Sequence, residues 1–319
     1  MVVALLAGLG AGRLEAFGAR GHLEATRAAV RAVPDDGPAF LREHEDWIVY
    51  LAMIPDSVRG RREPFSKMAE EPNHLWLKER VAFLNVVPRS RLEFELAVNA
   101  EHRRLVAAGK MEEAKYMNLR YTGTLPYAAV ENYERMVQGM RRYRAARARK
   151  SDTRFIEREV ALYFSYVGHY MIDGADTGNV TTDPRARGGR LENKYPDLVK
   201  LRAEEFQADI PAPKVVPDAF DAILAYLADI VNPAYVETVH GLEQRDALSN
   251  ATDQEAIALL RRQVARAAAM MRDLACTAWL RSAQDERMPW PLETMPTHPR
   301  YNPETGFAPA EPWPMTESK

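Results

Sequence analysis

His169 and Asp173 are the two residues whose types and spacing most directly predict chemistry. Four residues of α-helix advance about 400° around the axis, so the two side chains share one face of a helix. They lie at the end of an apolar segment, and the face that they share is therefore expected to be buried. A buried carboxylate is costly without a partner. A metal ion is a partner that would also account for the histidine, and a buried hydrogen-bonded pair without a metal is the simpler alternative.

Three further residues have side chains suited to a metal site. His22 lies at the start of a helix, His74 in a short extended piece between helices, and Asp56 at the end of a hydrophobic helix. Taken alone, His22 is more simply an exposed residue and Asp56 a turn residue or cap. The other histidines are interpreted as solvated side chains, as a helix end or as part of the C-terminal tail: His44, His102, His240 and His298.

The composition is that of an ordinary globular protein. Of 319 residues, 46% are apolar and 28% are charged. The net charge of −2 gives no sign of the basic surface that would bind duplex nucleic acid. A nuclease that acts through metal ions does not need such a basic surface. The single cysteine, Cys276, rules out an intrachain disulfide and a cysteine-based zinc site, so any metal must use histidine, carboxylate or backbone ligands.

The hydrophobic periodicity is helical almost throughout the chain. It predicts helices over residues 22–33, 38–54, 89–108, 126–148, 152–173, 217–240 and 252–283, with 38–54 either one helix or a broken pair. Residues 174–192, rich in Gly, Asp and Thr, are expected to form a long loop. Because no apolar alternation is long enough to build a sheet core, the sequence predicts a single all-α domain of about seven or eight helices.

The two ends of the chain differ from this helical middle. Residues 2–12 form an apolar run of signal-peptide length, too short to span a bilayer, so residues 1–16 are either a signal peptide or a short disordered or helical lead. A signal peptide would predict a secreted or periplasmic protein. Residues 288–319 are rich in proline and are expected to be extended or disordered, which leaves 17–287 as the helical metal-binding domain. No other segment is long and apolar enough to be inserted in a membrane.

Several short motifs follow one another in a recognisable order. They are an aromatic-Gly-x-x-Gly-His over 17–22, a Pro-Asp at 55–56, a Pro-x-His over 72–74, a His-x-x-x-Asp over 169–173 and a Thr-Ala-Trp over 277–279. This ordered set resembles the superfamily of zinc-dependent phospholipases C and single-strand-specific nucleases, over roughly residues 17–283. The resemblance implies an all-helical domain of that type, with three zinc ions in a cleft.

The resemblance also implies which residues bind two of these ions. One zinc would be held by Asp56, His74, His169 and Asp173. The second would be held by His22, by Asp173 as a bridge, and by the amino group and carbonyl of Phe17 as the mature N-terminal residue. Cleavage before Phe17 is required for that last role, and this is the reason to favour a signal peptide over a disordered lead.

The chain departs from the family pattern at the third zinc. Asn179 stands where the family has a histidine, and Glu192 stands in place of a second one. The third site is therefore absent or rebuilt from oxygen ligands, which favour harder ions. The candidates for such ligands are Asn179, Asp176, Asp183 and Glu192. Leu77 stands where the nucleases have an aspartate that reads the base edge, so a base-specific pocket is not expected.

The function that the resemblance implies is metal-dependent hydrolysis of phosphoesters, with Asp173 and Asp56 as the catalytic carboxylates. Two divalent ions bridged by a carboxylate would activate water and stabilise the leaving oxygen. Single-stranded nucleic acid, a phospholipid headgroup and a small phosphoester all remain open as substrates. The alternative is a catalytically impaired relative, acting as a binding or scaffold protein with a structural metal. A metal-free helical protein ranks third.

Overall fold

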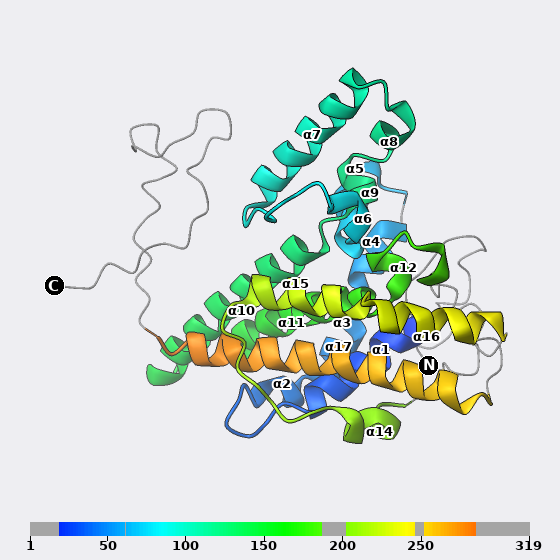
Figure 1. The fold of residues 1–319 in the computed structure, drawn as a ribbon. Coiled ribbons are helices and arrows are strands. Elements are labelled where there is room, and N and C mark those ends of the chain that lie inside the picture. The colour runs from blue at the N-terminus through cyan, green and yellow to red at the C-terminus, as the bar shows by residue number, and fades with distance from the viewer. Residues whose placement is uncertain (1–18, 61, 187–201, 246–251, 285–319) are drawn as a thin grey trace, which may run out of the picture.

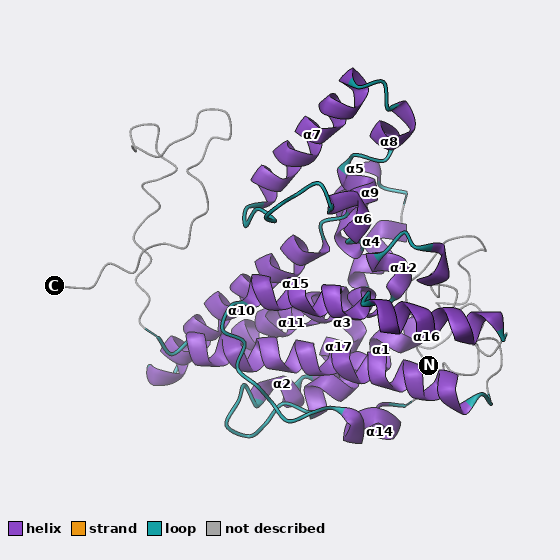
Figure 2. Cartoon of the chain, in the orientation of Figure 1, coloured by secondary structure: helices purple, strands orange, loops and turns teal. Residues whose placement is uncertain are grey.

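Every regular element in the described part of the chain is a helix (Figure 2). The computed structural model describes residues 19–60, 62–186, 202–245 and 252–284, and no strand occurs among them. The predicted all-α class is therefore confirmed. The expected leader and the expected Pro-rich tail lie outside the described residues.

Among the described residues, seven helices are twelve residues or longer, and shorter helical turns connect them. The long helices are α1 (Ala19–Arg31), α7 (Arg91–Ala107), α10 (Leu125–Ala148), α11 (Arg154–Ala175), α15 (Ala219–Ile230), α16 (Pro233–Gln244) and α17 (Gln254–Arg281). The short ones in the first half are α2 (Phe40–Glu43), α3 (Glu45–Leu51), α4 (Ile54–Gly60), α5 (Pro64–Glu70), η2 (Glu71–His74), α6 (Lys78–Val81), α8 (Met111–Lys115) and α9 (Leu119–Thr122). The later ones are α12 (Thr177–Val180), η3 (Pro184–Ala186), α14 (Ala203–Phe206) and η5 (Gln207–Asp209).

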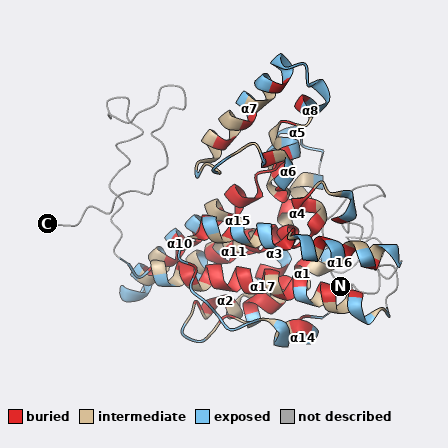
Figure 3. Ribbon diagram, viewed as in Figure 1, coloured by how far each residue is buried: buried red, intermediate tan, exposed pale blue. Residues whose placement is uncertain are grey.

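The centre of the fold is α11, which packs against α10, α17, α3 and α1 (Figure 1). Its contact with α10 is the most extensive between any two described helices. Residues 167–175 of α11 are all buried, and the buried apolar residues of its neighbours join them in one cluster (Figure 3). In contrast, α7 and α8 project away from this centre and expose much of their surface. The end of α11 that carries His169 and Asp173 is thus enclosed by other helices.

Two of the predicted boundaries are wrong, and side-chain chemistry explains both. The expected helix over 217–240 is broken into α15 and α16, because Pro233 begins the second helix and Asn232 caps it by accepting from the Tyr235 N–H. The expected loop over 174–192 is largely helical as far as it is described, since α11 continues to Ala175 and Asp176 caps α12. The segment 38–54 is the broken alternative, with α2, α3 and the start of α4.

None of the described helices is by itself long and apolar enough to cross a membrane. The pair α15 and α16 meets that test of length and composition only when its two members are joined across a bend of 41°. The apolar face of α15, including Phe220, Ile223 and Leu227, is buried within the protein.

The segment that presents His74 is anchored through its backbone. His74 ends the 3-10 turn η2, and residues 75–77 then run extended alongside residues 122–125. The Leu77 N–H donates to the Thr122 carbonyl at 3.0 Å, and the Leu125 N–H donates to the Leu75 carbonyl at 3.0 Å. Gly123 lies between these bonds with φ of +85°, and a Cβ there would lie 1.9 Å from the Leu75 oxygen. A glycine is therefore required at this position.

We expect Gly123→Ala to lower the free energy of unfolding by at least about 3 kcal/mol, since it adds a backbone clash to the strain of positive φ. Gly109→Ala is the matched control, because Gly109 has φ of +73° but no atom within 4 Å of the added Cβ. The control should cost only about 1–2 kcal/mol. Urea unfolding of both variants in the presence of a chelator measures the difference, and equal losses would contradict the proposed clash.

Candidate metal centre

His169 and Asp173 lie on one buried face of α11, as their spacing predicts. His169 Nε2 is 3.2 Å from Asp173 Oδ2, and both side chains are fully buried. The other ring nitrogen, His169 Nδ1, donates to the Ala52 carbonyl at 2.7 Å. Because a carbonyl only accepts, this bond fixes the proton on Nδ1 and leaves the Nε2 lone pair directed at the centre.

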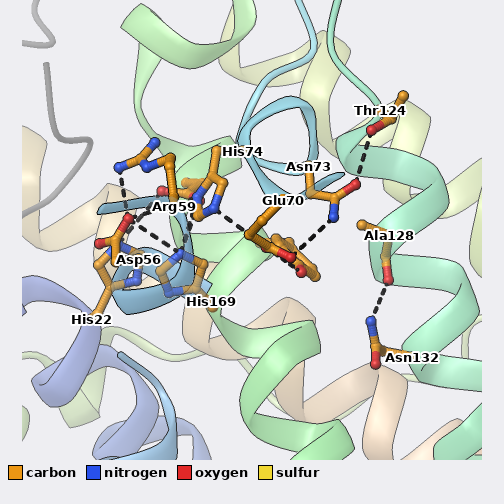
Figure 4. A network of polar contacts seen from close by, with 12 residues as sticks. His22, Asp56, Arg59, Glu70, Asn73, His74, Thr124, Ala128, Asn132 and His169 are labelled. Atoms are coloured by element: carbon orange, nitrogen blue, oxygen red, sulfur yellow. Dashed lines mark hydrogen bonds and ion pairs between the residues drawn. The ribbon is translucent and has the colours of Figure 1, made fainter. Parts of the chain in front are cut away.

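His74 and Asp56 meet this pair from other elements (Figure 4). His74 Nδ1 is 2.6 Å from Asp173 Oδ2 and 3.1 Å from His169 Nε2. Asp56 Oδ1 is 3.8 Å from His74 Nδ1 and 3.9 Å from His169 Nε2. The donor atoms of Asp56, His74 and His169 thus lie within 4.8 Å of one another, a spacing at which one ion could be shared. Asp56 lies in the first turn of α4 and not, as expected, at the end of a helix.

His22 approaches the other oxygen of Asp173. Its Nε2 is 3.5 Å from Asp173 Oδ1, and its ring stacks on that of His169 with centroids 4.1 Å apart. His22, His169 and Asp173 form a second group whose donor atoms lie within 4.8 Å. The side chain is fully buried, so the simpler interpretation of His22 as an exposed residue is wrong.

Several buried polar atoms at this place have no hydrogen-bond partner among the described residues. They are both ring nitrogens of His22, Nε2 of His74 and Oδ1 of Asp173. Leaving one such atom unsatisfied costs about 1–3 kcal/mol, so a cluster of them is unfavourable unless another group binds there. A cation bound by Oδ1 of Asp173 and Nε2 of His22 would satisfy two of these atoms, and the buried residues could therefore hold a metal ion.

Burial and charge inside the cluster favour the metal-binding forms of Asp173 and His22 but favour the protonated form of His74. Burial alone would raise the pKa of Asp173, but the neighbouring imidazoles of His169 and His74 outweigh burial and hold it well below the usual range. Burial and the adjacent His169 lower the pKa of His22, which keeps that ring neutral. Burial also opposes protonation of His74, yet the carboxylate of Asp173 and the contact with Glu70 raise its pKa to about 9.

Arg59 is a site residue that the sequence analysis missed. It lies one turn after Asp56 on α4, and its Nη2 donates to Asp56 Oδ1 at 2.6 Å. Its side chain is 16% exposed and that of Asp56 is 10% exposed, whereas the other four ligands are fully buried. The only sequence signal is an Asp and an Arg three residues apart on a helix, which is common on solvated surfaces.

The residues expected around a third ion do not form a metal group in the described part of the chain. Asn179 donates from its Nδ2 to the Asp173 carbonyl at 3.2 Å, and Asp176 accepts from the Gly178 N–H. Asp183 pairs with Arg185. The two groups with converging donors include none of these three residues. Phe17 and Glu192 lie outside the described residues.

Burial raises the pKa of Asp176 to about 7; the hydrogen bond from the Gly178 N–H opposes this rise, and the charge of Asp173 adds a smaller rise. Two histidines expected to be solvated have partners instead: His44 Nε2 lies 3.0 Å from Glu157 Oε2, and His102 Nδ1 donates to the Ala114 carbonyl at 2.9 Å.

Comparisons with known proteins identify no relative. No family model matches the sequence, and no curated protein or solved structure matches it either. The interpretation of the site therefore rests on its own geometry.

We expect zinc binding at pH 7.5 to release about one proton from His74, because a ring with a pKa near 9 is protonated before the metal displaces its proton. In the metal-free protein, the charged ring of His74 adds to the free energy of unfolding in full at pH values below its ordinary pKa of 6.5. This contribution is lost as the pH rises through its raised pKa of about 9. Zinc affinity should therefore rise about tenfold per pH unit between pH 6.5 and 8.5.

Calorimetry in buffers of different ionisation enthalpy measures the number of protons released. His44→Gln is the control, since His44 lies outside the cluster and its loss should leave the proton count unchanged. A zinc affinity that is flat over this pH range would show that His74 is neutral before the metal binds.

Proposed function

We propose that this protein is a metal-dependent phosphoester hydrolase with two divalent ions, and that it is a diverged relative of the zinc-dependent phospholipases C and single-strand-specific nucleases. The observation that carries the proposal is the convergence of five potential ligands, the carboxylate of Asp173 among them, in one cluster. They come from α1, α4, η2 and α11 and are His22, Asp56, His74, His169 and Asp173 itself. Such a set of nitrogen and carboxylate donors is typical of zinc.

The two oxygens of Asp173 support a bridging role. Oδ2 is directed at His74 and His169, at 2.6 and 3.2 Å, while Oδ1 is directed at His22, at 3.5 Å. Asp56, His74, His169 and Oδ2 would hold one ion, and His22 with Oδ1 would hold the other. The amino group and carbonyl of Phe17 would complete the second set if the leader is removed, in keeping with a secreted or periplasmic protein.

Two ions bound in this way would lower the pKa of a water molecule and offset the charge that develops on the phosphoryl oxygens. The chain's own residues keep the site ready for them. Asp173 stays ionised, His22 stays neutral, and the bond from Nδ1 of His169 to Ala52 keeps Nε2 available. Asp56 is the ligand nearest to solvent, so substrate is expected to approach from the side of α4.

Arg59 is placed to supply positive charge that the family obtains from a third ion. Its guanidinium lies beside Asp56 and has further N–H groups besides the one bound to Asp56. Guanidinium groups bind phosphoryl oxygens through two parallel hydrogen bonds. We infer that Arg59 binds the phosphoryl group of the substrate. The substrate class stays open between single-stranded nucleic acid, a phospholipid headgroup and a small phosphoester.

A second candidate function is a scaffold held together by a structural metal. The observation that favours it is burial, because His22, His74, His169 and Asp173 have no exposed surface in the described structure. Structural metal sites are typically closed in this way, whereas catalytic sites keep an open position. The number of bound ions and the hydrolysis of substrate distinguish the two functions.

We expect the purified protein to contain two equivalents of zinc and to hydrolyse a chromogenic phosphodiester. Asp173→Ala should lose both ions, because its two oxygens are directed at both groups, while His22→Ala should lose one. Elemental analysis after dialysis measures the metal content. Asp183→Ala is the control, since Asp183 binds Arg185 and no ligand of either group, and it should retain both ions.

One equivalent without hydrolysis would favour the structural metal over the enzyme. No metal after equilibration with excess zinc would refute both functions and leave a buried hydrogen-bonded cluster as the explanation of the site.

We expect Arg59→Ala to lower kcat about 10²–10³-fold without loss of metal, which is the effect of removing one strong electrostatic partner of a transition state. Arg59→Lys should retain part of the activity, because it keeps the charge and loses the paired N–H groups. Arg62→Ala is the matched control, since Arg62 is an exposed arginine just after α4. If Arg59→Ala lost metal instead, Arg59 would act by orienting Asp56.

A further inference from the structure

The imidazole of His74 has one nitrogen in the metal centre and one directed away from it. Nδ1 lies 2.6 Å from Asp173 Oδ2, whereas Nε2 lies 3.4 Å from Oε1 of Glu70 (Figure 4). Nε2 makes no hydrogen bond among the described residues, and Glu70 is the carboxylate within ion-pair distance of it. If Nδ1 binds a metal, Nε2 must carry the proton of the neutral ring, and Glu70 is the acceptor within reach.

Glu70 is itself held in place from two sides. The hydroxyl of Tyr170 donates to Glu70 Oε1 at 2.7 Å, and the Nδ2 of Asn73 donates to Glu70 Oε2 at 3.3 Å. Asn73 is in turn fixed through its Oδ1, which accepts from the hydroxyl of Thr124 at 2.9 Å and from Arg91 at 3.0 Å. Both oxygens of a carboxylate that is 13% exposed are thus engaged.

Tyr170 links this hydrogen-bond network to the metal ligands, because it is adjacent in sequence to His169. It directly follows His169 on α11, so a single helix turn carries a potential ligand and the donor that holds Glu70. The hydroxyl of Tyr170, which donates to Glu70, is therefore held close to the metal ligands by the backbone of α11.

We propose that Glu70, held by Tyr170, is a positioning residue that accepts the Nε2–H of His74 and so presents the Nδ1 lone pair to the metal. Carboxylates that accept the remaining N–H of a ligating histidine fix its tautomer and raise its basicity. This proposal rests on the metal site of the proposed function and adds a group that binds neither metal nor substrate. The competing explanation is that Glu70 only ties α5 to α11.

The test compares Glu70→Gln, Glu70→Ala and Tyr170→Phe with the wild-type protein. Competition with a chromogenic chelator measures the zinc affinity of the tighter and weaker ions, and the visible spectrum of the cobalt(II)-substituted protein reports the coordination of His74. We expect Glu70→Ala to weaken one ion about 10–100-fold and to change the cobalt spectrum. Glu70→Gln keeps an acceptor of the same shape and should recover part of the affinity, and Tyr170→Phe should show a smaller loss.

Glu71→Gln is the matched control, because this substitution removes the same charge from the adjacent position. Glu71 pairs with Arg120, away from His74. It should leave both the affinity and the spectrum unchanged. Thermal unfolding of each variant in chelator shows whether the fold is intact, and the isosteric glutamine variant covers the case in which alanine does not fold.

Two results would overturn the inference about Glu70. They are an unchanged zinc affinity with an unchanged cobalt spectrum in Glu70→Ala and Glu70→Gln, and equal losses in Glu70→Gln and Glu71→Gln. A wild-type protein that binds no zinc or cobalt would instead refute the proposed function, and the inference about Glu70 with it. The wild-type measurement therefore separates the two failures.

Discussion

The rest of the site depends on the buried carboxylate of Asp173. It lies at the end of the most enclosed helix of the fold, where an ionised group without partners would be strongly unfavourable. Three imidazoles surround it, yet one of its oxygens and several ring nitrogens still lack a hydrogen bond within the described residues. This incomplete compensation is the physical reason to infer a bound cation, because a cluster that served only stability would pair these atoms.

The fold brings the partners of Asp173 together by packing three separate elements onto α11. His22 arrives on α1, Asp56 on α4 and His74 on η2. The η2 segment is held by backbone hydrogen bonds to residues 122–125, and α4 follows α3, which packs along α11. A rigid support of this kind suits a metal centre, since small displacements of ligands are costly in affinity.

The centre is asymmetric, and the asymmetry bears on its chemistry. One side, at Asp56 and Arg59, reaches solvent, while the other side, at His22 and His169, is closed by neighbouring helices. Asn179, which stands where the family that the sequence resembles has a histidine, and Asp176, a candidate oxygen ligand, both form hydrogen bonds to the backbone instead. Positive charge for a substrate therefore comes from Arg59 in our proposal, which makes the reaction more dependent on one side chain than in a site with three ions.

The sequence by itself determined the all-α class and the shared face of His169 and Asp173, because helical periodicity is a local property that four residues suffice to reveal. It did not determine the breaks at Pro233 and Asp176, where a cap or a proline overrides the apolar pattern. The ordered motifs suggested His22 and His74 as ligands, but only the tertiary structure showed that their donor atoms converge near Asp173 and that His44 pairs with Glu157 instead. The sequence also gave no sign of the roles proposed for Arg59 and Glu70. Their contacts with Asp56 and His74 gain a role only when the packing of the helices brings Asp56 and His74 into one site.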